Sequence, residues 1–136
     1  MVLDTGNKRK EDNNLIIYQQ NIRSLNKKQD EINIMLQECQ RRPHLICLSE
    51  HHMRKEEMLG LALPGYKLAS CFCREKYAKG GVCILVRNDI HCQAVDLNNI
   101  CKEKIFEISA IRLDTSSTSM ILCCVFRSPS TKDNLF

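Results

Sequence analysis

The feature that most constrains the fold is a run of four apolar residues, from Leu45 to Leu48, which ends at Ser49 and Glu50. A short continuous apolar run is typical of a strand that is buried on both faces of a sheet. Glu50 comes where this strand leaves the sheet, and open α/β sheets bind ligands just beyond the carboxyl ends of their strands. A carboxylate there can bind a hard cation, act as a base or contact only water, and the run by itself leaves all three open.

The residues before this run predict a βαβ unit. Residues 15–18 suit a first strand, and apolar residues then recur at helical spacing over 26–42, with Asn26 as the expected N-cap. The two strands of a βαβ unit are parallel and end at the same edge of the sheet. Asn21, just after the first strand, is therefore expected beside Glu50, although a turn residue bonding its own backbone is the alternative.

The rest of the chain alternates apolar runs with turns. The short connections predict that its strands are antiparallel neighbours. The expected strands are 66–74, 82–86, 90–97, 105–113 and 120–126.

Two segments between the predicted strands carry polar chemistry. His51 and His52 suggest a loop at the mouth of a site, with neither imidazole essential to it. The pair Gly80 and Gly81 lies in no phosphate-binding P-loop pattern and instead predicts a hairpin or a close backbone approach. The lysines beside Tyr77 could touch a phosphate chain, but solvated loop charges are the commoner case.

Composition narrows the function classes. The net charge of +4 permits a polyanionic partner such as nucleic acid without requiring one. The chain has no Trp and only 5% aromatic residues, which argues against a base-stacking platform as the main binding device. Nine cysteines without a signal peptide indicate free thiols in a reducing compartment, with no disulfides and no structural zinc. No apolar run has the length of a membrane span, so we expect a nuclear or cytoplasmic protein that is not secreted.

Five segments, taken together and in this order, resemble one family. The chain is similar to the N-terminal part of the endonuclease/exonuclease/phosphatase superfamily, and within it to the endonuclease domain of non-LTR retrotransposons of the jockey-like and LINE type. Residues 1–13 are then a flexible polar leader, and 14–136 a partial domain lacking its C-terminal half. The segments that carry the resemblance are 20–25, 48–51, 65–68, 80–86 and 125–130.

The resemblance implies a two-layer α/β sandwich, with two sheets packed together and helices outside. It implies hydrolysis of phosphodiester bonds in DNA with Mg²⁺ or Mn²⁺. Glu50 matches the metal-coordinating Glu of the family and Asn21 the active-site Asn paired with it. Mg²⁺ binds oxygen ligands and keeps several waters, so one carboxylate plus phosphate oxygens suits it. Arg23 and Arg127 become candidates for binding nucleic acid.

Two departures from the family weaken the enzymatic interpretation. Phe126 occupies the position of a family Tyr whose hydroxyl contacts the phosphate, and Phe cannot supply that group. The family's later segments, which orient the attacking water and act as general base, are not in this sequence. A water without a positioned base loses on the order of 10²–10⁴ in rate. We therefore expect the polypeptide to be inactive alone, with the missing endonuclease or reverse-transcriptase portion as its partner.

Two alternatives stay open. One is a non-catalytic domesticated remnant that binds nucleic acid or a protein partner. The other is a phosphatase branch of the same fold, which the segments 21–25 and 127–130 disfavour. The partial domain also predicts an incomplete second sheet, with open edges and an uncovered apolar face.

Overall fold

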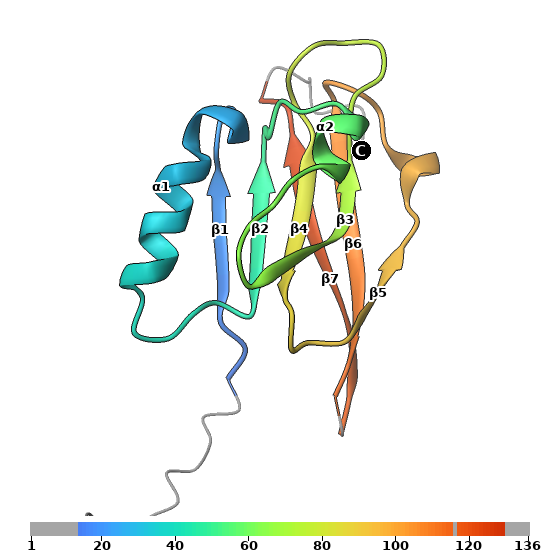
Figure 1. The fold of residues 1–136 in the computed structure, drawn as a ribbon. Helices are drawn as coiled ribbons and strands as arrows, with labels where there is room; N and C mark the ends of the chain where they lie inside the picture. The colour runs from blue at the N-terminus through green and yellow to red at the C-terminus, as the bar shows by residue number, and fades with distance from the viewer. Residues whose placement is uncertain (1–13, 116, 130–136) are drawn as a thin grey trace, which may run out of the picture.

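The computed structural model describes residues 14–115 and 117–129, which form two β-sheets with short helices (Figure 1). The predicted leader, 1–13, lies outside the described residues, as do the last seven residues of the chain. The elements are β1 (Ile17–Asn21), α1 (Leu25–Glu38), β2 (Leu45–Ser49), α2 (Lys55–Leu59), β3 (Tyr66–Phe72), β4 (Val82–Arg87), β5 (Cys92–Val95), the 3₁₀ helix η1 (Asn98–Ile100), β6 (Phe106–Asp114) and β7 (Ser119–Arg127).

The first sheet contains the predicted βαβ unit. Its strand order is β1-β2-β4-β3, and β1 runs parallel to β2 with Asn21 opposite Ser49. β4 is antiparallel to both of its neighbours. The parallel opening and the antiparallel later strands are thus confirmed.

The apolar run of β2 is buried because the strand is covered on both sides. All five of its residues are buried. Ile46 and Leu48 point toward α1 and pack with Leu36 of that helix, whereas Leu45 and Cys47 point toward the second sheet. Continuous burial removes the polar alternation that a half-exposed strand shows, which is why the sequence pattern identified this strand.

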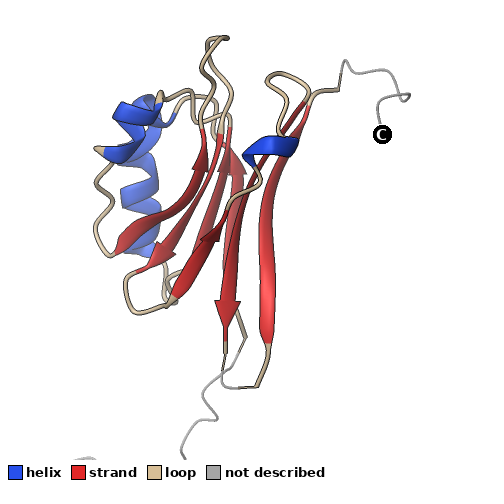
Figure 2. Cartoon of the chain, turned by 90° about the vertical axis from the view of Figure 1, so that its right-hand side faces the viewer, coloured by secondary structure: helices blue, strands red, loops and turns tan. Residues whose placement is uncertain are grey.

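The second sheet is antiparallel throughout, with the order β5-β6-β7. Its inner face packs on the first sheet, as Figure 2 shows from the side. The α/β class is therefore confirmed. The shared core of the two sheets consists of Leu45, Cys47, Val82, Ile84, Val86, Ile111, Leu113 and Cys124.

Some predicted boundaries differ from the structure. The helix α1 ends at Glu38 instead of residue 42, because Cys39 already adopts an extended conformation (φ −67°, ψ 128°) on the way to Pro43. Asn26 does not cap α1, since Ser24 occupies the N-cap position and Asn26 donates a hydrogen bond to Glu57 Oε2 instead (3.0 Å).

Three other differences concern β3, α2 and β5. The strand β3 ends at Phe72, two residues before the prediction, because the Arg74 side chain turns inward and bonds Glu107 (Nε to Oε2, 2.6 Å). The five-residue helix α2 was not predicted, since 51–57 is a polar segment without helical periodicity. β5 covers only four residues of the expected 90–97.

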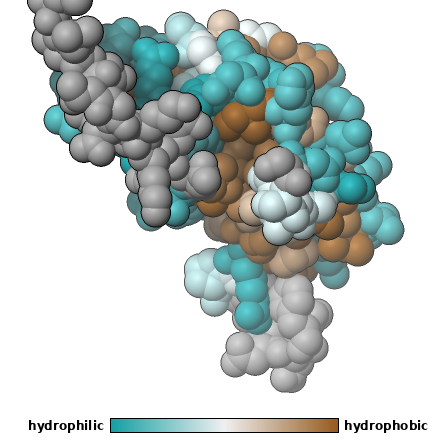
Figure 3. All heavy atoms as spheres, turned by 90° about the horizontal axis from the view of Figure 1, so that it is seen from below, coloured by the Kyte–Doolittle hydropathy of each residue, from teal (hydrophilic) through white to brown (hydrophobic). Residues whose placement is uncertain are grey.

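The expected open edge is present in the described part of the chain. β7 is the last strand of its sheet, and the Ile121 and Val125 side chains on it are 62% and 49% exposed. Figure 3 shows hydrophobic side chains at the lower surface of the molecule among hydrophilic ones. Among the described residues, no helix is both long and apolar enough to cross a membrane.

Candidate active site

The carboxyl ends of β1 and β2 bring the two predicted site residues to one edge of the first sheet. Asn21 is the last residue of β1, and Glu50 follows Ser49, the last residue of β2. Asn21 lies directly opposite Ser49 in the parallel register. Asn21 is exposed, and the Glu50 side chain is 25% exposed. Oxygen ligands from both residues are thus open to solvent at the same edge.

The backbone at this edge is held in left-handed conformations without glycine. Arg23, Ser24, Glu50 and His52 have φ angles of 46°, 92°, 54° and 61°. Such conformations cost about 1–3 kcal/mol each and persist where surrounding structure fixes them. Four of them at one sheet edge mark a corner whose geometry is strongly determined.

Hydrogen bonds between the loop after β1 and the loop after β2 hold the backbone in these conformations. Ile22 N donates to Ser49 O (2.9 Å), Ser24 N to Glu50 O (2.9 Å) and Leu25 N to His51 O (3.0 Å). These three backbone hydrogen bonds join the loop after β1 to the loop after β2. Glu50 is therefore held by the backbone of both segments.

The charged partner of Glu50 is weakly coupled to it. Arg23 Nε lies 3.9 Å from Glu50 Oε2, and the Arg23 side chain is 78% exposed. Exposed ion pairs contribute about 0–1 kcal/mol, because water solvates both charges. Arg23 therefore leaves the Glu50 carboxylate accessible. The exposed Arg23 guanidinium is also accessible to a phosphate that approaches Glu50.

His51 lies in the predicted loop after β2, but its side chain points into the interior. It is fully buried; its Nδ1 accepts a hydrogen bond from Met53 N (2.9 Å) and its Nε2 lies 2.9 Å from Phe72 O. These partners require a neutral ring protonated on Nε2. Burial lowers the pKa of His51, which keeps the ring neutral. His51 is thus a loop residue, as predicted, whose ring is buried and does not reach solvent.

His52 is an imidazole whose ionisation is influenced by the charge of Glu50. It is half-buried, and burial lowers its pKa while the Glu50 charge opposes that change. The sequence pattern had assigned no role to this residue. His52 thus adds a titratable group to the segment that follows Glu50.

The glycine pair predicted to mark a close approach does so. Gly80 and Gly81 have φ angles of 65° and 88°. A Cβ on Gly81 would lie 2.3 Å from His51 Cε1, and a Cβ on Gly80 would lie 2.1 Å from Arg74 Cζ. Gly80 O also accepts a hydrogen bond from His52 N (2.8 Å). The turn between β3 and β4 is thus the third segment of the edge.

Phe126 lies near the end of β7, partly buried against the core between the sheets. The Cys124 thiol contacts Leu48 O (3.7 Å), which places this end of β7 beside the end of β2. Phe126 contributes ring packing there and no hydroxyl. Arg127, the other predicted nucleic-acid contact, is the exposed last residue of β7.

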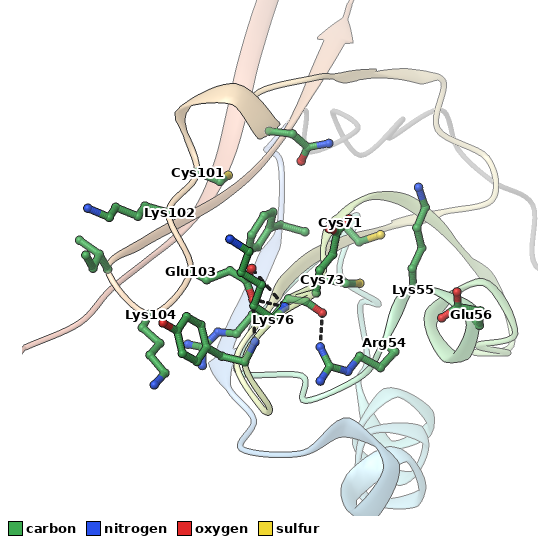
Figure 4. Close-up of a pocket in the computed structure, with 16 residues that line it drawn as sticks. Arg54, Lys55, Glu56, Cys71, Cys73, Lys76, Cys101, Lys102, Glu103 and Lys104 are labelled. Atoms are coloured by element: carbon green, nitrogen blue, oxygen red, sulfur yellow. Dashed lines mark hydrogen bonds between the residues drawn. The ribbon is translucent and has the colours of Figure 1, made fainter.

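A cavity of about 1000 Å³ lies between the start of α2, the end of β3 and the loop before β6 (Figure 4). Its wall includes Arg54, which donates to Arg74 O, and Tyr77, whose ring stacks under the Lys104 ammonium (3.8 Å to the centroid). Three glutamates share the wall with the cations, so the cavity carries both signs with positive charge in excess. Its charged lining residues are Arg54, Lys55, Glu56, Arg74, Glu75, Lys76, Lys102, Glu103 and Lys104.

Two thiols also line the cavity. Cys71 and Cys73 lie on the same face of the chain around the end of β3, and Cys73 Sγ is 3.9 Å from His51 Nε2. A hydrogen bond from the Cys73 thiol lowers the pKa of Cys71 to about 7. All nine cysteines are free thiols in this structure.

The donor set at the edge fits a hard cation of the Mg²⁺ type. Among residues 14–115 and 117–129, no three His, Cys, Asp or Glu side chains converge as a metal cage. Mg²⁺ does not need one, since it is held by one or two carboxylates, waters and substrate phosphates. Glu50 and the Asn21 amide carry oxygen atoms of the kind that such a site uses, and both lie at this edge of the sheet.

No family model and no curated protein matches the chain. Among solved structures it is similar to the 3′ phosphatase NExo from Neisseria bound to a product DNA hairpin (TM-score 0.48, 19% identity, 79% of this chain and 40% of that one). It is also similar to the 3′-5′ exonuclease NExo from Neisseria meningitidis (TM-score 0.46, 20% identity, 77% of this chain and 39% of that one). The chain thus spans about two fifths of each neighbour's length, and at these TM-scores the likeness supports no conclusion about function.

Proposed function

We propose that this chain is the metal- and DNA-binding part of a phosphodiesterase of the endonuclease/exonuclease/phosphatase type, similar to the nicking endonucleases of non-LTR retrotransposons. The observation that carries the proposal is the pairing of Asn21 and Glu50 at one edge of parallel strands. The five sequence segments that resemble this family support it, because they include both residues and the glycine turn that holds the edge.

In this proposal Glu50 is the main protein ligand of Mg²⁺ or Mn²⁺, and the Asn21 amide oxygen is its neighbour. The bound cation supplies charge neutralisation at the scissile phosphate and at the leaving oxygen. The protein's own part is positional. The hydrogen bonds from Ile22 N to Ser49 O and from Ser24 N to Glu50 O fix the backbone that carries Glu50 before substrate arrives, so little backbone reorganisation accompanies binding.

DNA is the proposed substrate, and the cavity between α2, the end of β3 and the loop before β6 is its proposed binding path. Arg54, Lys102 and Lys104 provide cations for backbone phosphates along that wall. Arg23, whose Nε lies 3.9 Å from Glu50 Oε2, provides a further cation beside the carboxylate. Contacts of this kind release counterions, so binding weakens steeply as salt is raised.

We propose further that the chain does not cut DNA without a partner that completes the site, such as an endonuclease or reverse-transcriptase portion. Phe126 lacks the hydroxyl that the family places there. Among the described residues, His52 is a candidate for accepting a proton beside Glu50, although burial lowers its pKa. A non-catalytic DNA-binding remnant is the alternative, and it differs by needing no Glu50.

The test uses supercoiled plasmid with Mg²⁺, for both nicking and binding. We expect saturable, salt-sensitive binding that Mg²⁺ strengthens, and no nicking. The variant Glu50→Gln should abolish the Mg²⁺ effect while leaving the salt dependence. Binding that ignores both Mg²⁺ and Glu50 would favour the remnant, and nicking that depends on Glu50 would overturn the requirement for a partner.

A further inference from the structure

The inner face of the second sheet holds a carboxylate with no exposure to solvent. Glu107, on β6, is fully buried. Its Oε2 accepts hydrogen bonds from Arg74 Nε (2.6 Å) and Lys104 N (2.9 Å), and its Oε1 accepts one from Gly81 N (2.8 Å). One side chain thus ties together the end of β3, the turn before β4 and the loop before β6.

The surroundings of this carboxylate are built to receive it. Arg74 is only 9% exposed, so the charge of Glu107 is matched by a guanidinium inside the protein. Arg74 Nη1 also donates to Ala78 O (3.1 Å), within the same turn. Gly80 leaves the space that the guanidinium fills, since a Cβ there would lie 2.1 Å from Arg74 Cζ. A buried ion pair needs such additional partners to offset its desolvation.

The turn held by Glu107 is the one that holds the candidate active-site loop. Gly81 O accepts the hydrogen bond from His51 N (3.3 Å), and Gly80 O accepts the one from His52 N (2.8 Å). Both donors directly follow Glu50, whose left-handed φ of 54° needs support from its neighbours. A continuous set of hydrogen bonds therefore leads from the second sheet to Glu50.

We propose that Glu107 is a positioning residue for Glu50. Its carboxylate fixes the Gly80–Gly81 turn, and the turn's carbonyl groups fix the backbone that presents Glu50 at the sheet edge. The catalytic meaning of this arrangement rests on the proposed function, whereas the mechanical link does not. A purely structural role, in which Glu107 only clamps the two sheets together, predicts different behaviour.

The experiment measures amide hydrogen exchange in the full chain carrying Glu107→Gln. A glutamine offers one acceptor oxygen, so it cannot serve both Gly81 N and the Arg74 guanidinium as the carboxylate does. We expect the amides of His51 and His52 to exchange at least about tenfold faster, while amides of α1 and of β7 keep their protection.

The matched control is Ser109→Ala, on the same strand and the same face. Ser109 Oγ donates to Ser70 Oγ (2.6 Å), a polar contact between the two sheets that does not involve the turn. We expect this variant to leave exchange at His51 and His52 unchanged. Unchanged exchange in Glu107→Gln, or an equal loss of protection in every element, would overturn the proposal.

A second variant covers the case in which Glu107→Gln does not fold because a guanidinium is left buried and unpaired. The double substitution Glu107→Gln with Arg74→Met removes that charge, and the same exchange pattern is expected from it. Mn²⁺ affinity is measured on the same samples, and we expect it to fall about tenfold in both Glu107 variants but not in Ser109→Ala. If the unmodified chain binds no Mn²⁺, the proposed function fails, while the exchange pattern still decides the mechanical link.

Discussion

The contact between Gly81 and His51 gives the sharpest stability prediction. Replacement of Gly81 by Ala places a Cβ 2.3 Å from His51 Cε1 and 2.9 Å from Phe72 O, in a backbone with φ of 88°. The left-handed conformation costs an L-residue about 1–2 kcal/mol. Overpacking against a buried ring adds about 1–3 kcal/mol. We therefore expect the free energy of unfolding to fall by about 2–5 kcal/mol, a large share of the stability of a typical domain.

Two other glycines separate these contributions. Gly65 shares the left-handed backbone (φ 87°), but a Cβ there meets only the flexible end of Arg42 at 3.2 Å. Gly60 has a φ of −88°, and a Cβ there has ordinary contacts of 3.5 Å or more. Urea unfolding should rank the alanine variants in the order Gly81, Gly65, Gly60, with the last changing stability by less than about 1 kcal/mol. A Gly81→Ala variant no less stable than Gly65→Ala would refute the close approach to His51.

Three further outcomes follow from individual side chains. Because burial lowers the folded-state pKa of His51 below its ordinary value of 6.5, stability should be retained above pH 6.5 and should fall as the pH drops below it; His51→Gln should flatten this decline in urea titrations, and parallel curves would contradict it. Cys71, with a pKa of about 7 at the cavity wall, should react with iodoacetamide at pH 7 much faster than the buried Cys83, whose pKa burial raises, as peptide mapping can check. Ile121→Lys, on the exposed edge strand, should reduce self-association in light scattering without loss of stability, and unfolding of this variant would show that Ile121 is not exposed.

The features that could be predicted from the sequence are those that depend on the pattern of neighbouring residues. The apolar run of β2 is recognisable because both of its faces are covered, and the βαβ unit follows from a helical period between two apolar segments. Asn21 and Glu50 came out as neighbours because parallel strands of such a unit end at one edge.

Other parts of the site depend on contacts that no local pattern contains. His51 is buried because Gly81 and Phe72, 30 and 21 residues away, form its pocket. Glu107 sits in an apolar strand with only partial alternation, where a charged residue usually faces water. The glycine pair predicted a hairpin or a close backbone approach, but it did not identify His51 or Glu107 as the residues involved. Long-range pairing of this kind requires the fold.

The central claim is that Glu50 binds a divalent cation, and Mn²⁺ binding tests it most directly. Free Mn²⁺ is followed by electron paramagnetic resonance in titrations of the unmodified chain, of Glu50→Gln and of Glu56→Gln, a matched change at an exposed glutamate on α2. We predict one bound Mn²⁺ whose affinity falls at least about tenfold in Glu50→Gln and stays the same in Glu56→Gln. Equal binding by all three proteins, or none by the unmodified chain, would contradict the account.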